Sequence, residues 1–297
     1  MTKEVKNRQY NIGEVTNASL YCRYLLDKSE NVDIEEVIKI INEENLEKKD
    51  PELMMLIART YRDGKGIDKN LEKAEQIMAE LQKNGIHTYD MEYVDLIYKR
   101  NKKSDFDKAT NILNRMIQGD PEAYGKLGRA YRDGKGVEKD LSKAIELLEH
   151  AANNKVGWAR NELFDILYSS DDENDHKKAV EIISITADKN DRYALPRLGK
   201  AYRDGKGVEK DLDKALDCFE RSYEAGVQNS GLEMINTLIE RSYKGDLEKA
   251  FRIALELSDK GNKEAMAIIG NMYRDGLYVE RDAKKALEWF DKASGGF

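Results

Sequence analysis

Apolar residues recur along this chain with the spacing of an α-helix. The clearest case follows Asp140, where one face of the expected helix carries Leu141, Ala144, Ile145, Leu147, Leu148, Ala151 and Ala152. No stretch of the sequence keeps the strict alternation of apolar and polar residues that marks a half-buried β-strand. The pattern therefore predicts an all-α protein.

One polar motif interrupts these helices at a regular interval. It reads YRDGKGIDKNLEKA at 61–74, YRDGKGVEKDLSKA at 131–144, YRDGKGVEKDLDKA at 202–215 and YRDGLYVERDAKKA at 273–286. Its copies lie 70–71 residues apart, and the Lys-Ala pair that ends each copy also occurs midway, so the basic period is 35–36 residues. Periods of this length are typical of helix pairs that bury their apolar faces by stacking on one another.

We therefore expect one α-solenoid domain over residues 1–297, built from about eight antiparallel helix pairs. The expected repeats span approximately 10–48, 50–85, 88–118, 120–154, 157–189, 191–225, 229–260 and 262–297.

Local signals mark where the helices of the motif-bearing repeats begin and end. The first helix begins at Asp-Pro (Asp50-Pro51 and Asp120-Pro121), because Asp caps a helix and Pro lacks the N–H that would be unpaired there. It ends before a glycine that can adopt the left-handed conformation: Gly64, Gly134, Gly205 and Gly276. The second helix follows a capping side chain: Asn70, Asp140, Asp211 and Asp282.

The motif has a second glycine, which Tyr278 replaces in the last copy. We infer that the first glycine carries the stricter backbone requirement, so replacing Gly134 should cost more stability than replacing Gly136. Packing roles fall to the tyrosine and the alanine of each motif: Tyr61, Ala74, Tyr131, Ala144, Tyr202, Ala215, Tyr273 and Ala286.

The charge balance narrows the class of partner. The net charge is −7 and the pI is about 5.4. A protein that grips nucleic acid along its length needs a basic excess, so we expect no nucleic-acid partner. The N-terminal residues lack the apolar core of a signal peptide, and no segment has the length and apolarity of a membrane helix. We therefore expect a cytoplasmic protein without membrane insertion.

Residues that carry chemistry are few and scattered. The histidines, His87, His150 and His176, show no metal-ligand spacing, and Cys22 and Cys218 belong to no CxxC pair. The DGKGVEKD stretch lacks the alternating acids of a calcium loop and the GK[ST] ending of a phosphate loop, and a helix–helix turn explains its glycines. No GxSxG or Cys–His arrangement indicates a nucleophile. We expect no metal, no cofactor and no enzymatic activity.

Charged residues in the first helices form two series in register. Arg59, Arg129, Lys200 and Asn271 precede the motif tyrosines by two residues, and the intervening repeats place Glu92, Glu162 and Glu233 in register with one another. One interpretation is a set of ion pairs between repeats; the other is a polar groove floor that meets a partner. A third series, Arg62, Arg132, Arg203 and Arg274, occurs in every motif and is expected to bind the carboxylates of its own loop.

The motif Y-x-D-G-x-G-V-x-x-D-x-x-K-A resembles that of the SEL-like repeat family, relatives of the tetratricopeptide repeat, over roughly residues 50–297. The resemblance implies a right-handed α-solenoid that scaffolds protein complexes, frequently in bacteria. The wording YRDGKGVEKDL also looks like repeat proteins of bacterial surface-polysaccharide gene clusters. The expected function is a non-catalytic protein–protein scaffold linked to such assembly. The alternative is a regulatory or substrate-binding arm of a larger enzyme such as a glycosyltransferase.

The first helices of the central repeats are the expected docking face for a protein or peptide, between about residues 88 and 205. Arg, Tyr and Trp dominate binding hot spots, and the candidate residues are Tyr93, Arg129, Trp158, Tyr193 and Lys200. The competing expectation places docking, or homo-oligomer formation, at an uncapped C-terminal repeat that ends at Phe297.

Overall fold

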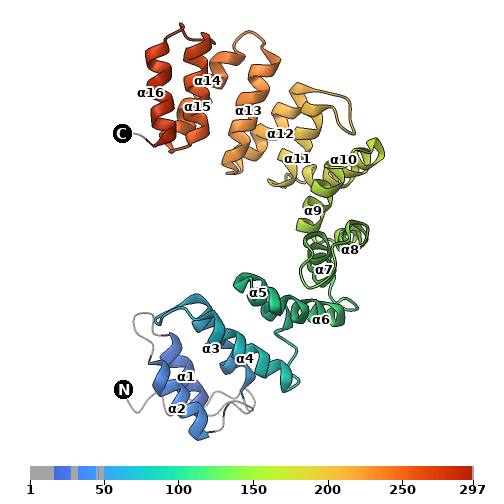
Figure 1. The fold of residues 1–297 in the computed structure, drawn as a ribbon, viewed down its shortest axis with the longest axis vertical. Coiled ribbons are helices and arrows are strands. Elements are labelled where there is room, and N and C mark those ends of the chain that lie inside the picture. Colours follow the sequence, from blue (N-terminus) through green and yellow to red (C-terminus); the bar gives the residue numbers. More distant parts are fainter. Residues whose placement is uncertain (1–16, 28–32, 45, 47–49, 296–297) are drawn as a thin grey trace. The chain divides into compact units, whose positions relative to one another are not determined.

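A computed structural model describes residues 17–27, 33–44, 46 and 50–295. In this part of the chain sixteen α-helices follow one another without a strand, which confirms the all-α prediction (Figure 1). The helices are α1 (Asn17–Asp27), α2 (Ile34–Glu44), α3 (Pro51–Asp63), α4 (Leu71–Lys83), α5 (Asp90–Arg100), α6 (Phe106–Met116), α7 (Pro121–Asp133), α8 (Leu141–Asn153), α9 (Gly157–Tyr168), α10 (Glu173–Ala187), α11 (Ala194–Asp204), α12 (Leu212–Glu224), α13 (Gln228–Arg241), α14 (Asp246–Asp259), α15 (Lys263–Asp275) and α16 (Ala283–Ser294). A short 3₁₀ turn, η2 (Lys103–Asp105), precedes α6.

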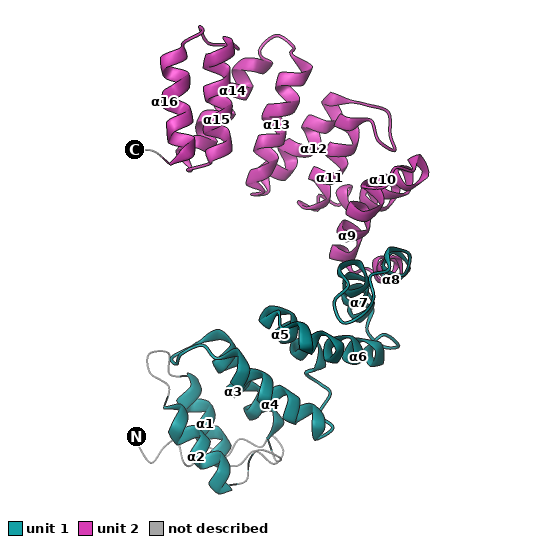
Figure 2. Cartoon of the chain, in the orientation of Figure 1, with its two compact units in different colours: residues 1–147 teal, residues 148–297 magenta. Residues whose placement is uncertain are grey.

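The helices divide into two compact units, residues 1–147 and 148–297 (Figure 2). Within unit 1, α1 packs on α2, α3 on α4 and α5 on α6; within unit 2 the pairs are α9 with α10, α11 with α12, α13 with α14 and α15 with α16. The second helix of a pair also contacts the first helix of the next pair, as α4 does with α5, α10 with α11 and α12 with α13. Each unit is thus a run of consecutively packed helix pairs, the architecture of an α-solenoid. A single domain over the whole chain stays a prediction.

The helix ends follow the local signals of the sequence. Asp50 accepts a hydrogen bond from the Leu53 N–H at 2.9 Å and Pro51 fills the first position of α3. At the other end Gly64 has φ of +70°, and its N–H donates to the Thr60 carbonyl at 2.9 Å. The same left-handed cap ends α7, α11 and α15, at Gly134, Gly205 and Gly276.

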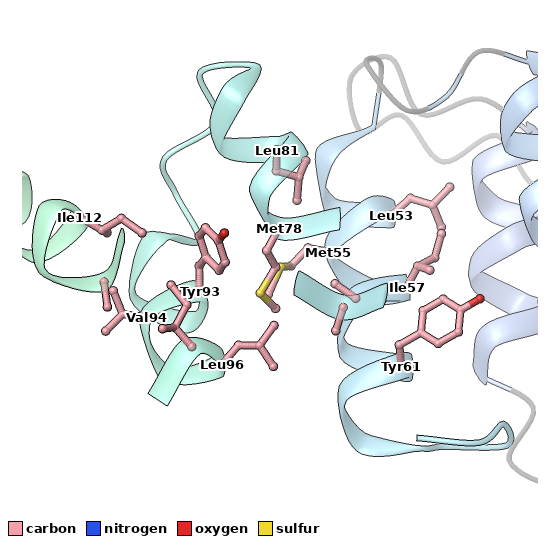
Figure 3. Close-up of a cluster of buried hydrophobic side chains, with 14 of the residues drawn as sticks. Leu53, Met55, Ile57, Tyr61, Met78, Leu81, Tyr93, Val94, Leu96 and Ile112 are labelled. Atoms are coloured by element: carbon pink, nitrogen blue, oxygen red, sulfur yellow. The ribbon is translucent and has the colours of Figure 1, made fainter. Parts of the chain in front are cut away.

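The core of unit 1 shows why these helices pack in pairs (Figure 3). Leu53, Met55 and Ile57 of α3 are buried, together with Met78 and Leu81 of α4 and Tyr93, Val94 and Leu96 of α5. The motif alanines Ala74, Ala144, Ala215 and Ala286 are all buried. An alanine there permits a close approach between helices, because its side chain ends at Cβ.

The ranking of the two motif glycines expected from the sequence is wrong. A Cβ on Gly134 would meet its nearest neighbour, the Lys139 Cβ, at 3.4 Å, which is an ordinary contact. A Cβ on Gly136 would stand 2.9 Å from the Asp107 backbone nitrogen and closer still to the Phe106 carbonyl oxygen. The loop lies against the start of α6, and the Thr110 hydroxyl donates to the Gly136 carbonyl at 3.2 Å. The second glycine therefore carries the stricter requirement.

Gly207 repeats this contact in unit 2. A Cβ there would lie 2.8 Å from the Lys177 nitrogen and closer to the His176 carbonyl oxygen. Tyr278 keeps the left-handed φ of +67°, and its ring lies 5.6 Å from the Phe251 ring. The last copy of the motif therefore accommodates the Tyr278 side chain at the position where Gly136 and Gly207 lie against backbone in the two central copies.

Burial should make both thiols unreactive in the folded protein. Cys22 and Cys218 are free and buried, and desolvation raises the pKa of each thiol from 9.0 to about 11. At about pH 8 the thiolate fraction then falls roughly 100-fold relative to an exposed cysteine. We expect Ellman's reagent to label native protein slowly and urea-unfolded protein at once, with two thiols per chain. Rapid labelling of the native protein would contradict the described packing.

None of the helices in the described residues has the length and apolar character needed to span a membrane.

Candidate binding site

Within unit 1, Arg59 and Glu92 of the charged series form an ion pair between repeats. Arg59 Nε donates to Glu92 Oε2 at 3.0 Å, and Arg62 Nη1 reaches the same oxygen at 3.3 Å. In unit 2, Glu233 instead accepts from Arg203. No ion pair joins Lys200 to Glu233 in the described residues, which corrects the pairing that register suggested.

The arginine that follows each motif tyrosine binds its own loop, as expected. Arg62 Nε donates to Asp63 Oδ1 at 2.8 Å and Nη2 donates to Oδ2 at 2.7 Å. The same neighbouring pair forms at Arg132–Asp133, Arg203–Asp204 and Arg274–Asp275. Each of these arginines forms an ion pair with the aspartate at the end of its helix. The ion pair offsets the negative charge of that carboxylate.

A concavity of about 540 Å³ opens in unit 2 between the first helices of three successive pairs, α9, α11 and α13. We call it the α9–α11 cradle. Its lining consists of Phe164, Asp165, Tyr168, Ser169, Pro196, Arg197, Lys200, Asp204, Lys206 and Glu233.

Two stacked aromatic rings underlie this cradle. Phe164 and Tyr168 are buried, and their ring centroids lie 4.8 Å apart with the planes 16° from parallel. The Tyr168 hydroxyl donates to Asp204 Oδ2 at 2.9 Å. Burial first, and then this hydrogen bond to a carboxylate, raise the pKa of Tyr168 above its usual value. The phenol therefore stays neutral and serves as a fixed platform.

The carboxylates of the cradle have cationic partners. Arg197 binds Asp165 through two parallel hydrogen bonds of 2.9 and 2.7 Å. Arg203 binds both Glu233 and Asp204. These ion pairs hold the acids of the cradle in place.

Two lysines remain whose ammonium groups face the platform. Lys200 Nζ lies 5.3 Å from the Tyr168 ring centroid and Lys206 Nζ lies 5.5 Å from it. Such cation–π contacts orient an ammonium group without cancelling its charge. Within the described residues no ion pair is formed by either lysine. The cradle thus combines an aromatic base with two available cations.

The residues expected at the docking face lie in different environments. Lys200 lines the cradle, and Tyr193, 51% exposed, lies at the start of the same helix with the Arg192 guanidinium 4.8 Å from its ring centroid. Arg129 lies on α7 of unit 1, where burial lowers its pKa, and Trp158 is half-buried on α9.

Tyr93 is a correction. It is buried in the core of unit 1 and its hydroxyl donates to Glu75 Oε1 at 2.8 Å, so it is a packing residue and not part of an open face (Figure 3). The competing docking surface, the C-terminal repeat, contains α15 and α16, and docking there stays a prediction. Its residues 296–297, which include Phe297, lie outside the described residues.

Three residues that line the cradle were not identified as site residues from the sequence: Tyr168, Arg197 and Lys206. Lys206 is the lysine of the DGKG motif, which the sequence explains fully as a turn. Tyr168 recurs at Tyr98 of the intervening repeats, a signal that spacing alone could have revealed. Among the described residues no group of three His, Cys, Asp or Glu side chains could hold a metal ion.

Comparison with known proteins agrees with this architecture. The model of the Sel1 repeat matches residues 51–78, 121–156, 193–227 and 263–294. Rat DAP3-binding cell death enhancer 1 is 28% identical over 93 residues, which are 31% of this chain and 18% of that protein. An uncharacterised protein of Neisseria meningitidis serogroup B is 26% identical over 192 residues, 64% of this chain and 32% of its own length. The chain therefore spans less than a third of either relative.

Two solved structures share the fold. A protective antigen present in uropathogenic Escherichia coli strains, which displays an SLR fold, superposes with a TM-score of 0.68 at 18% identity, over 94% of this chain and 61% of that one. A Sel1 repeat protein from Oxalobacter formigenes superposes with a TM-score of 0.52 at 21% identity, over 93% of this chain and 96% of that one. At these identities the likeness concerns the fold alone.

Proposed function

We propose that this chain, which matches the Sel1 repeat in four segments, is a non-catalytic protein–protein scaffold that receives a protein segment in the α9–α11 cradle. The observation that carries the proposal is the concavity itself. It is lined by the first helices of successive pairs, the helices expected to face a ligand, and it joins an apolar base to polar groups that can orient a peptide.

The chemistry of the cradle supports binding over catalysis. Its acids are held by Arg197 and Arg203, and its phenol is kept neutral by burial. Aromatic and cationic side chains at the base of a concavity are the usual components of binding hot spots.

The second candidate is a regulatory or substrate-binding arm of a larger enzyme. One observation favours it: the chain spans only 18% and 32% of the two curated relatives, so those proteins contain further segments. A link to envelope-polysaccharide assembly belongs to the proposal of a scaffold. It rests on the amino-acid sequence of the repeat motif.

A bulky side chain at the rim should block the cradle without changing its charge. Ser169 is exposed on the cradle wall, so Ser169→Trp fills part of the concavity. We expect peptides selected on the wild-type chain from a phage-displayed random library to lose affinity at least tenfold, about 1.4 kcal/mol, for this variant. Isothermal titration calorimetry with the selected peptides measures the loss.

Ile185→Trp is the matched control, because Ile185 is 50% exposed on α10, the second helix of the same pair. Its affinity should stay within about twofold of wild type, a difference near 0.4 kcal/mol. Selection of no peptide, or equal affinity of Ser169→Trp and wild type, would count against the cradle as the binding site.

A further inference from the structure

We propose that the α9–α11 cradle recognises an acidic peptide segment, whose Asp or Glu carboxylates lie between Lys200 and Lys206 while an adjoining apolar side chain packs against Pro196. This inference rests on the proposed function and names the chemistry of the partner.

Charge complementarity is the first argument. The cradle is lined by Arg197, Lys200 and Lys206, and its acids are bound by Arg197 and by Arg203 beside the cradle. Both lysine ammonium groups lie within 5.5 Å of the Tyr168 ring centroid, so they converge on one place. A carboxylate there would gain two charge-assisted hydrogen bonds, which are stronger than neutral ones.

An equivalent constellation in unit 1 serves as an internal comparison. Tyr98, Asp133 and Lys135 precede Tyr168, Asp204 and Lys206 by 70–71 residues. In unit 1 Arg132 binds both oxygens of Asp133, at 2.7 and 3.3 Å, and Lys135 Nζ also lies 3.9 Å from Asp133 Oδ2. The buried Tyr98 hydroxyl has no hydrogen-bond partner in the described residues.

The equivalent residues of unit 2 make different contacts. There the Tyr168 hydroxyl takes Asp204 at 2.9 Å, and Arg203 Nε takes the other carboxylate oxygen at 3.1 Å. Lys206 forms no ion pair with Asp204 in the described residues, so its charge is available to a ligand. The hydrogen bond of Tyr168 is therefore what distinguishes the cradle from its counterpart.

The base of the cradle favours a peptide over a polyphosphate or a nucleic acid. Pro196 lies half-buried in the lining that also contains the two cations, and the rings of Phe164 and Tyr168 are buried. This lining suits a segment that mixes acidic and apolar side chains. A long polyanion requires an extended run of cations. Here the net charge is −7 and the flanking surface includes Asp165 and Glu233.

Fluorescence anisotropy with a synthetic probe tests the inference. The probe is a short fluorescein-labelled peptide in which glutamates alternate with leucines and glycines; its counterpart carries glutamine at every glutamate. We expect the glutamate peptide to bind at least roughly tenfold more tightly than the glutamine peptide. Lys200→Gln and Lys206→Gln together should remove that preference.

Two control variants remove the same charge elsewhere. Lys135→Gln alters the equivalent lysine of unit 1, and Lys210→Gln removes a lysine that pairs with Glu240 beyond the cradle. Both should bind the glutamate peptide within about twofold of wild type. Circular dichroism melts confirm that each variant folds.

Three results would overturn the inference. They are equal affinity for the two peptides, unchanged affinity after loss of Lys200 and Lys206, and displacement of the glutamate peptide by inorganic polyphosphate or oligo-dT at lower concentration than by unlabelled peptide. The proposed function can hold where this inference about acidic peptides fails. If Ser169→Trp blocks library peptides that carry no acidic residues, the cradle binds protein segments but not acidic ones.

Discussion

Gly207→Ala should destabilise unit 2 by about 3 kcal/mol. Two costs add: an alanine at φ of +74° is strained by roughly 1–2 kcal/mol, and overpacking costs typically 1–3 kcal/mol. The overpacking arises because the new Cβ would lie 2.8 Å from the Lys177 nitrogen, and backbone at the start of α10 cannot move aside as a flexible side chain can. Gly136→Ala should behave alike in unit 1, against the start of α6.

Gly226 provides the matched control in the same unit. It has φ of +92° at the end of α12, but a Cβ there would meet nothing within 4 Å. Gly226→Ala should therefore show the conformational cost alone, roughly 1–2 kcal/mol. Urea unfolding followed by circular dichroism gives both values. Equal losses for Gly207→Ala and Gly226→Ala would show that the contact with α10 carries no cost.

Arg100→Met should cost about 3–5 kcal/mol, because it removes the buried cation that binds two buried carboxylates. The Arg100 side chain is only 9% exposed, and its Nη1 lies 3.1 Å from Asp105 Oδ2 and 3.5 Å from Glu75 Oε2. Glu75 also accepts from the buried Tyr93 hydroxyl, so the substitution disturbs a network that joins α4, α5 and the start of α6. Methionine keeps much of the arginine's volume, so the loss reports charge and hydrogen bonding more than a cavity.

Lys108→Met removes a cation from the same two acids at a more exposed position. Lys108 Nζ lies 3.2 Å from Glu75 and 3.7 Å from Asp105, but its side chain is 53% exposed. Water screens such a pair, and the expected loss is below about 1 kcal/mol. The two variants compared by urea unfolding separate burial from charge. A similar loss for both would show that the environment of Arg100 is as well solvated as that of Lys108.

The difference between the position of a residue in its repeat and the contacts of its side chain explains which site residues the sequence can identify. Lys200 was predicted at the binding face because its position in the repeat places it on a first helix, and it does line the cradle. Tyr93 sits on a first helix too, but its ring enters the core and its hydroxyl reaches Glu75. Period and residue type assign a helix to a face; they do not assign the direction of one side chain within it.

What the sequence determined by itself is local. The period of 35–36 residues defined the helix pairs, Asp50-Pro51 and the other capping residues defined where helices begin, and Gly64 and its equivalents defined where they end. Each cap depends on residues within about one helical turn, whose conformational preferences are independent of the rest of the chain.

Only the tertiary structure decided the contacts between repeats. Gly136 meets Phe106 and Gly207 meets His176, each from the preceding repeat, and Glu233 binds Arg203 where register favoured Lys200. These contacts join residues about 30 positions apart. Their distances depend on how one helix pair packs on the next, and a periodic sequence does not encode that packing angle at any single position. The strict glycine is therefore the one that approaches neighbouring backbone, although its loop tolerates Tyr278 where that approach is absent.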